Sequence, residues 1–387
     1  MSVDLDLGPN AAGFRREIRE WLSENAPRDR AGFDREAWTA ALREAGYLCV
    51  SWPKEYGGRG LTGVEVAVMN EEFARFRVPR ITMGMGEGLV GPAIILHGSE
   101  EQKAHFLPRI ISGEDVYCQG FSEPDSGSDL ASMKTRGIVD GDEVVVTGQK
   151  VWTSGFYAAN MMFCLCRTNP DVPKHQGISY VLIPLRREDG TPNGIEFRGL
   201  KQLTGESHFA ETFLNEARAP LFNVIGGLNH GWKTAMTTLG NERGGSATTQ
   251  HVQFKVEVEK LIEEARRRGR ADDPRVRQQL AWAWTHVEIM RFRGLQLLSA
   301  LAESRDPGPA GSIHKMFWSE YQRRLGEIAL DIVGPEATIV GERGWSGWQR
   351  TFLTTRSHTI WGGTAEIQRN IVGEKVLGLP KEPGTTE

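Results

Sequence analysis

The hydrophobic pattern of the first third of the chain predicts helices. Apolar residues recur at helical spacing within residues 11–25 and share one face: Phe14, Ile18, Trp21 and Leu22. Pro27 ends that run. Further along, Thr62 is followed three residues later by Glu65, the signature of a capping box, so we expect the next helix to begin there.

The middle of the chain instead predicts short β-strands. Residues 135–139 and 143–147 flank Asp140-Gly-Asp142, a strong hairpin-turn signal. Further strands are expected at 161–166, 178–183, 195–198 and 209–214, separated by turns rich in Pro, Gly and Asp. Several short strands at short intervals suggest a sandwich or barrel of roughly 100 residues.

The last third returns to helical periodicity, over residues 231–268, 274–302, 312–333 and 364–376, with a break at 304–311. The order is therefore helices, strands, helices, which makes the fold class α+β. We expect an N-terminal helical domain over 1–117, a central β-sandwich or barrel domain over 118–226 and a C-terminal helical domain over 227–387.

Composition narrows the function classes. The 387 residues allow two or three domains, and the net charge of -4 gives no basic field, so nucleic acid is not an expected partner. No apolar run approaches the roughly 18 to 20 residues of a membrane span, and the N-terminus lacks the features of a signal peptide. Four cysteines argue against a disulfide framework. Cys164 and Cys166 would share one side of a strand, and no cluster completes a metal site around them, so we expect core cysteines in a cytoplasmic protein.

Residues 119–129, directly after an apolar segment, are the most informative stretch: Gln119-Gly-Phe-Ser-Glu-Pro-Asp-Ser-Gly-Ser-Asp129. Small residues let the backbone approach a ligand, and consecutive N–H groups can face an anionic or electron-rich ring system. On composition alone, a surface turn rich in Ser, Asp and Gly is the better interpretation.

This loop, together with two other motifs, resembles the acyl-CoA dehydrogenase family over nearly the whole chain and in the family's order. The other motifs are Thr147-Gly-Gln-Lys-Val-Trp-Thr-Ser154 and the tail that runs from Gly362-Gly-Thr-Ala-Glu-Ile-Gln368 through Leu377-Gly-Leu379. The resemblance implies a helical domain, a β domain and a C-terminal four-helix bundle. It also implies FAD, bound between the β domain and the helices of a neighbouring subunit.

The family's reaction is the α,β-dehydrogenation of an acyl-CoA thioester to the 2-enoyl-CoA. A carboxylate removes an α-proton while a hydride moves from the β-carbon to flavin N5. Such a site needs hydrogen-bond donors at the thioester oxygen, a base on the face opposite the flavin, and dryness that raises the base's pKa. The resemblance implies an electron-transferring flavoprotein as the acceptor.

The resemblance also assigns site residues. Phe121, Ser122, Gly127 and Ser128 would line the flavin ring and the thioester, with Trp152 and Ser154 flanking the ring near N5. Further cofactor contacts would come from Thr364 and Glu366, and substrate contacts from Ser128, Arg243 and Trp361. Without the resemblance, core packing at a strand end is the better interpretation of Trp152.

The catalytic base is displaced relative to many family members. These place a glutamate directly before Gly-Thr in the C-terminal motif, where this chain has Gly362. A subgroup resembling isovaleryl- and long-chain-type dehydrogenases carries the glutamate earlier, before an arginine, and this chain has Asn241-Glu-Arg243 there. Glu242 is therefore the expected base, and Gly362 would offer space and an N–H that joins a flavin ribityl hydroxyl at the thioester oxygen.

The apolar pattern supports Glu242. It belongs to a stripe with 3-4-3-4-3 spacing on one helix face: Trp232, Ala235, Leu239, Glu242, Ser246 and Thr249. A charge on such a stripe is costly unless it is paired or functional. Two alternatives stay open, namely that Glu242 pairs with a nearby cation, or that Gly240, Gly244 and Gly245 break the helix and let Glu242 face solvent.

Two segments depart from the family pattern. The stretch Arg266-Arg-Arg-Gly-Arg-Ala-Asp-Asp-Pro274 lacks the usual Phe-Gly, and in Leu330-Asp-Ile-Val-Gly-Pro-Glu336 an aspartate stands where Gln is usual and Gly-Pro where Gly-Gly is usual. In the family, the first segment normally reaches the FAD pyrophosphate of a neighbouring subunit, and the second approaches the adenosine half of that FAD. The four arginines (266, 267, 268 and 270) could still neutralise phosphates or could form a solvated basic helix end. The losses suggest a heterotetramer whose second subunit completes the site; the alternative is a homotetramer with substituted contacts.

Other functions remain open. An acyl-CoA oxidase or flavin monooxygenase could use the same fold, and a non-catalytic subunit could merely complete a partner's site. The arrangement resembles actinobacterial dehydrogenases of sterol side-chain thioesters, so the pathway would be fatty-acid or sterol side-chain degradation. Small residues beside the expected base, Gly240, Gly244, Gly245 and Ser246, could leave room for a bulky or branched acyl chain.

Overall fold

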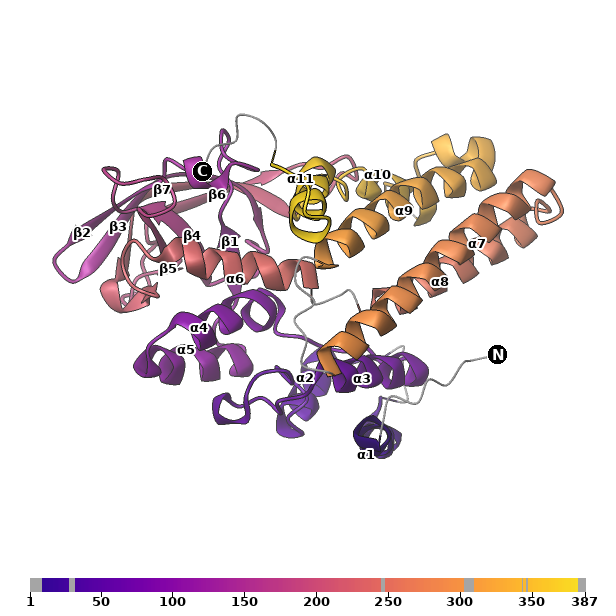
Figure 1. Cartoon of the computed structure of the whole chain (residues 1–387), viewed down its shortest axis with the longest axis horizontal. Coiled ribbons are helices and arrows are strands. Elements are labelled where there is room, and N and C mark those ends of the chain that lie inside the picture. The colour runs from indigo at the N-terminus through magenta and orange to yellow at the C-terminus, as the bar shows by residue number, and fades with distance from the viewer. Residues whose placement is uncertain are drawn as a thin grey trace.

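The structure is a computed structural model that describes residues 9–27, 32–244, 248–302, 310–342, 344–345 and 347–381. Helices, a β-sheet and further helices follow one another along the chain, as the sequence predicts. The sheet lies at one end of the molecule and the long helices α7–α9 at the other (Figure 1). Among the described helices, none is long and apolar enough to cross a membrane.

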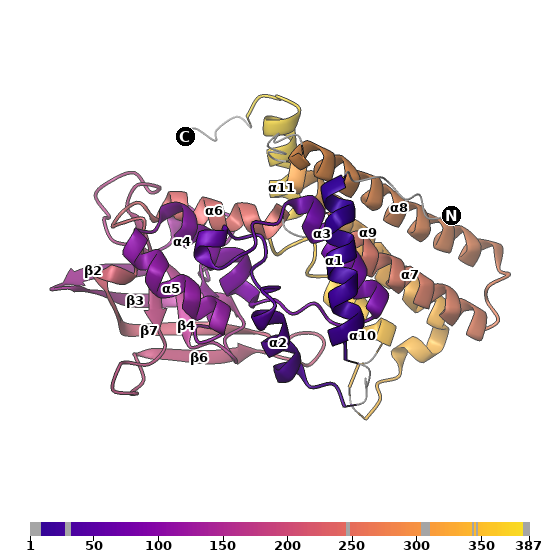
Figure 2. The same cartoon turned by 90° about the horizontal axis from the view of Figure 1, so that it is seen from below.

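Five helices form the N-terminal region: α1 (Pro9–Asn25), α2 (Arg35–Glu44), α3 (Gly63–Phe76), α4 (Gly91–His97) and α5 (Glu100–Ser112). The predicted apolar face of α1 is confirmed, because Phe14, Ile18 and Leu22 are buried in one core with residues of α3. The capping box is also confirmed: the Thr62 side chain accepts from Glu65 N–H, and the Glu65 carboxylate accepts from Thr62 N–H. Helices α4 and α5 lie across one face of the sheet (Figure 2).

The strands are β1 (Tyr117–Gly120), β2 (Arg136–Asp140), β3 (Glu143–Ser154), β4 (Met161–Arg167), β5 (Ile178–Pro184), β6 (Ile195–Leu200), β7 (Phe209–Pro220) and β8 (Val224–Ile225). All eight belong to one sheet of order β6-β7-β3-β2-β4-β5-β8, with β1 paired to β4. The predicted hairpin is present, with Asp140 opposite Glu143 and Gly141 at a φ of 64°.

The sheet folds over itself to give the packed layers of a sandwich. Strand β2 pairs with β3 along its length but with β4 at one residue, so the sheet turns there. Val146 and Leu214 of one layer meet Cys164 and Val181 of the other in a single buried cluster. Cys164 and Cys166 are buried free thiols, as expected of core cysteines, and burial raises the pKa of Cys164 to about 11.

The C-terminal region contains α6 (Gly231–Gly244), α7 (Gln250–Arg267), α8 (Pro274–Ala302), α9 (Ala310–Val333), α10 (Gly347–Thr355) and α11 (Ala365–Ile371). The long helices α7, α8 and α9 pack together, α10 packs on α9, and α3 packs against α8. The sequence did not predict α10. Helix α8 runs antiparallel to both α7 and α9, so the start of α7, the end of α8 and the start of α9 lie at the same end of the bundle (Figure 1).

The prediction of one helix over 231–268 is wrong, because α6 ends at Gly244 and α7 begins at Gln250. Glycine is a poor helix former, and the chain carries glycines at positions 240, 244 and 245, which favours a break there. The predicted stripe therefore extends along α6 alone: Ala235 is buried, and Trp232 and Leu239 pack against the core beneath α4. Thr249 lies outside α6, and Ser246 is outside the described residues.

Candidate active site

The loop after β1 is held in shape by a buried ion pair. The Glu123 carboxylate accepts from the N–H groups of Lys134 (2.6 Å) and Thr135 (2.9 Å) and from Lys150 Nζ (2.9 Å). Lys150 Nζ also donates to the carbonyl oxygen of Phe121, at 3.1 Å. Burial alone would raise the pKa of Glu123, but Lys150 and the N–H donors outweigh it and hold that pKa below its ordinary value. The loop is therefore fixed from beneath by a lysine of β3.

Trp152 sits on a β-bulge that turns its indole out of the sheet. In the pairing of β3 with β7, Lys150 lies opposite Thr212 and Thr153 opposite Ala210, so two residues of β3 face one of β7. Trp152 takes a φ of 61°, a conformation that non-glycine residues rarely adopt. Its side chain is 59% exposed and meets Phe209 edge to face at 6.2 Å. The alternative interpretation of Trp152, core packing at a strand end, is therefore wrong.

The bulge and the loop are joined directly. The N–H of Val151 donates to the carbonyl oxygen of Ser122 at 2.8 Å, which places Ser122 beside the residue that precedes Trp152. Phe121 is buried against Phe163 and Tyr180, so its ring supports the loop from the core side. Ser154 Oγ lies 3.4 Å from the carbonyl oxygen of Trp152. The structure thus brings Phe121, Ser122, Trp152 and Ser154 together.

The far end of the loop is more open. Gly127 and Ser128 are exposed, and a Cβ at Gly127 would meet nothing within 4 Å. Ser126 is buried and donates to the carbonyl oxygen of Asp129 at 2.6 Å, while Lys174 pairs with the Asp129 carboxylate at 2.8 Å. The open backbone at residues 127–128 is therefore available to a ligand.

A second group of predicted residues lies on the turn before α11. Gly362 and Gly363 take φ values of 66° and 88°, and Thr364 caps α11 by accepting from the N–H of Ile367. The buried side chain of Lys315 donates to the carbonyl oxygen of Gly363 at 2.8 Å, and Gln368 donates to that of Gly362 at 3.0 Å. Glutamate would rarely adopt the backbone conformation of position 362.

Trp361 and Glu366 flank this turn. The indole N–H of Trp361 donates to Ser357 Oγ at 3.1 Å, and its ring contacts Trp318 and His358. Glu366 is exposed in the first turn of α11, where a backbone N–H and the Thr364 hydroxyl lower its pKa. Within the described part of the chain, no hydrogen bond, ion pair or ring contact joins this group to the residues around Trp152.

The expected base lies at the edge of the described residues. The backbone of Glu242 and Arg243 belongs to α6, but their side chains lie outside the part of the chain that the structure describes. Helical register still places position 242 on the face that carries Ala235 and Leu239.

The arginines of the first divergent segment meet the second divergent segment. Arg268 donates to Glu264 (2.6 Å), to the Val333 carbonyl oxygen (2.8 Å) and to Glu336 (2.8 Å). Arg270 donates to the carbonyl oxygen of Asp331. Arg267 pairs with Glu264, whereas Arg266 is exposed. We call the residues that join α7 to the end of α9 the distal ion-pair cluster: Arg268, Arg270, Asp331 and Glu336.

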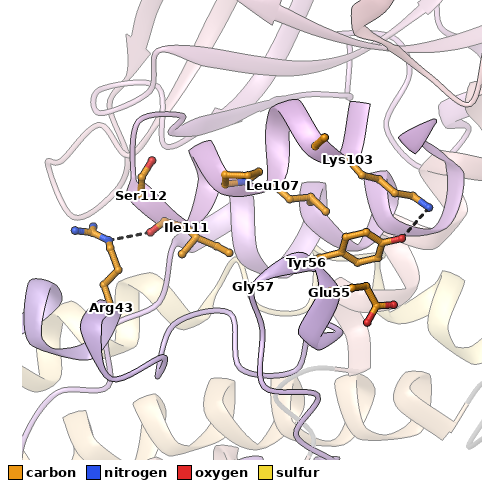
Figure 3. A pocket seen from close by; sticks show the side chains of 10 residues that line it. Arg43, Glu55, Tyr56, Gly57, Lys103, Leu107, Ile111 and Ser112 are labelled. Atoms are coloured by element: carbon orange, nitrogen blue, oxygen red, sulfur yellow. Dashed lines mark hydrogen bonds between the residues drawn. The ribbon is translucent and has the colours of Figure 1, made fainter. Parts of the chain in front are cut away.

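The cavities of the N-terminal helices are separate from these residues. One hollow of about 350 Å³ lies between α2, the turn at residues 54–57 and α5. Figure 3 shows Tyr56 and Leu107 in its wall, with Arg43 at one end and Lys103 at the other. A more open one runs along α1, past Phe14 and Arg59. None of the predicted site residues lines either hollow.

Three supporting residues were missed by sequence reasoning: Lys150, Lys315 and Gln368. The sequence held a signal for Lys150, because alternation along β3 places it on the same buried face as Val144 and Val146. A charge on such a face needs a partner. Lys315 likewise occurs one residue after the buried His314, within an amphipathic helix. For Gln368 we find no signal beyond its place in the C-terminal motif.

Comparisons with known proteins agree with the fold and the motifs. The chain matches the family models for the N-terminal, middle and C-terminal domains of acyl-CoA dehydrogenases at residues 10–114, 118–216 and 229–377. It is 40% identical over 383 residues to acyl-CoA dehydrogenase IpdE1 of Mycobacterium tuberculosis, covering 95% of this chain and 98% of that protein.

Two solved structures are also similar. The Tcur3481-Tcur3483 steroid ACAD has a TM-score of 0.81 and 30% identity, covering 98% of this chain and 100% of that chain. The ChsE4-ChsE5 complex from Mycobacterium tuberculosis has a TM-score of 0.78 and 29% identity, covering 99% and 100%. Both names join two components, so these neighbours are heteromeric, and members of the family are flavoproteins. With all three domains matched, this chain belongs to the acyl-CoA dehydrogenase family.

Proposed function

We propose that this chain catalyses the FAD-dependent α,β-dehydrogenation of an acyl-CoA thioester to the 2-enoyl-CoA, with Glu242 as the base that takes the α-proton. The observation that carries the proposal is the direct link between the Ser122 loop and the Trp152 bulge, through the Val151 N–H bond to Ser122. That link joins the two motifs that resemble the flavin-facing wall of the family.

The residues around Trp152 fit a flavin ring. An exposed indole on a bulge offers a flat face, and the open backbone at Gly127 and Ser128 lets a ring approach closely. When bound there, FAD supplies the acceptor for the hydride that leaves the β-carbon. In this proposal Phe121, Ser122 and Ser154 complete the wall, and Thr364 and Glu366 contact the cofactor from α11.

The backbone at position 362 supports a base elsewhere in the chain. Gly362 has a φ of 66°, so this turn is built for glycine and not for a catalytic glutamate. Helical register places position 242 on the same face of α6 as Ala235 and Leu239, and a dry active site would raise the pKa of a glutamate there toward working pH. The Gly362 N–H then serves as a donor at the thioester oxygen, while Arg243, Trp361 and Ser128 hold the substrate.

The distal ion-pair cluster supports a heterotetramer. Arg268 and Arg270 already contact Glu264, Glu336 and the end of α9, so they do not fit a pyrophosphate without breaking these bonds. The chain would therefore contribute the flavin-ring half of a site, and a second dehydrogenase-like subunit would supply the adenine-side contacts. The heteromeric structures similar to this chain favour the same arrangement.

The physiological setting follows from the same proposal. The electron acceptor would be an electron-transferring flavoprotein, and the pathway the degradation of fatty acids or sterol side chains, since one similar structure is a steroid ACAD. Four buried free thiols suit a reducing compartment such as the cytoplasm.

The test compares the chain purified alone with the chain co-purified with a candidate second subunit. We expect flavin in the complex and anaerobic bleaching of its absorbance by acyl-CoA thioesters, with slow reoxidation in air. Rapid hydrogen peroxide formation would indicate an oxidase instead. Full flavin occupancy and turnover by the chain alone would contradict the heterotetramer, and a flavin that no thioester reduces would contradict the dehydrogenase.

A further inference from the structure

The bundle has a polar layer at the end opposite the distal ion-pair cluster. The inward stripes of α7, α8 and α9 are apolar along most of their length, for example at Val258, Met290 and Leu325. At this end the three helices instead carry polar side chains with buried atoms, and these lie close enough for Arg293 and His251 to act on His314 electrostatically: His251 on α7, Arg293 on α8 and His314 on α9. We call these three residues the polar layer.

The polar layer has buried hydrogen-bonding atoms for which the described residues offer no partner. These atoms are Arg293 Nε, His251 Nδ1 and His314 Nδ1. His314 is fully buried, and its Nε2 bonds the Gln250 side-chain oxygen at 2.9 Å, which leaves Nδ1 as an unused acceptor. An unsatisfied buried polar group costs stability, so three of them in one layer call for an explanation.

No carboxylate compensates the Arg293 charge within ion-pair distance in the described part of the chain. Glu288, which precedes Arg293 on α8, instead accepts a hydrogen bond from Arg291 at 3.2 Å. Burial lowers the pKa of Arg293 from its ordinary value, and burial, aided by neighbouring cations, lowers those of His251 and His314 to about 4. The layer therefore holds one cation and two neutral imidazoles at neutral pH.

The polar layer adjoins the proposed active site. His314 is followed by Lys315, which donates to the carbonyl oxygens of His358 (2.9 Å) and Gly363 (2.8 Å), next to Gly362. Helix α6, which carries position 242, contacts α9, and the two meet near the start of α9 (Figure 1). The polar layer therefore lies at the same end of the bundle as the proposed base and the proposed thioester site.

On the basis of the proposed function, we propose that the polar layer binds an oxygen atom at the end of the acyl group farthest from the thioester. The Arg293 Nε–H donates to that oxygen, and His251 donates to it from Nδ1 in the tautomer that carries its proton there. The preferred substrate class is then an acyl-CoA whose chain ends in a carboxylate or a ketone, and not a plain alkyl chain. Both groups present the same acceptor oxygen, and the experiment distinguishes them.

The test uses the holoenzyme, with its partner chain if one is required, and three acyl-CoA thioesters of equal length that end in a methyl group, a ketone or a carboxylate. We expect kcat/KM for one oxygenated thioester to exceed that for the methyl-ended one at least tenfold. Arg293→Met should lower kcat/KM for the preferred oxygenated thioester by about 10- to 100-fold, the range expected when a hydrogen bond to a charged group is lost. It should leave kcat/KM for the methyl-ended thioester unchanged. Arg275→Met, an exposed arginine on the same helix, is the matched control.

Calorimetry measures the binding of the three thioesters without any turnover. A failure of the proposed dehydrogenase activity can therefore be distinguished from a failure of the proposed binding preference. Arg293→Met should also leave the unfolding free energy unchanged or raise it, because it removes an unpaired buried group. The inference is overturned by equal binding of all three thioesters, by preference for the methyl-ended one, or by an equal effect of Arg293→Met on all three.

Discussion

The ammonium of Lys150 lies 2.9 Å from the carboxylate of Glu123, and both side chains are buried beneath the loop that follows β1. Lys150 also donates to the Phe121 carbonyl oxygen. It therefore connects β3 to the start of the loop at two residues, Phe121 and Glu123. Separating this pair would leave a buried charge without a partner. The shape of the loop proposed to face the flavin therefore depends on a lysine of β3 that lies beneath it.

Lys150→Met should lower the unfolding free energy by about 3–5 kcal/mol, because Glu123 keeps its burial and loses its cation. Urea denaturation of the purified protein measures the change. Lys134→Met is the matched control: Lys134 forms an exposed pair with Asp125, and we expect a loss below about 1 kcal/mol. Equal losses in the two variants would show that the buried pair does not hold the loop.

Replacing Trp152 should separate backbone strain from cofactor binding. Glycine accepts a positive φ without steric cost, so Trp152→Gly should be more stable than Trp152→Ala by about 1 kcal/mol. Both variants should retain less flavin through gel filtration, because both lack the indole. Full flavin retention by Trp152→Ala would remove this residue from the proposed cofactor wall.

Three histidines, of which His314 is buried and His251 and His358 are half-buried, should make the protein sensitive to mild acid. Burial, together with neighbouring cations, lowers the pKa values of His251, His314 and His358 to about 4. Since an unfolded histidine titrates near 6.5, the unfolded state binds more protons between these values, and stability falls as pH drops from about 6.5 to about 4. Denaturation curves at pH 7, 6 and 5 measure the slope, and His314→Phe should reduce it. A slope that His314→Phe leaves unchanged would be inconsistent with a buried neutral His314.

Lys315→Met should loosen the turn before α11. The variant removes the lysine donor from the carbonyl oxygens of His358 and Gly363 and leaves Gly363 with a long bond from Gln368 (3.4 Å), at a cost of about 1–3 kcal/mol. We expect turnover to fall while flavin content stays near that of the wild type, as absorbance and steady-state assays would show. The exposed Lys375→Met serves as control. Unchanged turnover at saturating substrate would mean that the turn does not position the thioester.

Sequence reasoning found what depends on local patterns and missed what depends on distant partners. The α1 face, the Thr62 capping box and the hairpin at Gly141 each follow from residues close together in the chain. The Trp152 bulge depends on its register with β7, about sixty residues away, and the Arg268 bonds reach the end of α9 across a similar distance. Neither relation has a local signature. The end of α6 at Gly244 was expected only as an alternative. Glycine content alone cannot decide it, because packing can keep a glycine-containing helix continuous.

The identity of the base tests the account most directly. In the flavin-loaded enzyme, single-turnover reduction by an acyl-CoA thioester should slow by about 10²- to 10⁴-fold in Glu242→Gln, the range expected when a general base is lost. Glu259→Gln, an exposed acid on α7, should behave as wild type. A Glu242→Gln enzyme that reduces its flavin at the wild-type rate would show that the α-proton goes to another residue.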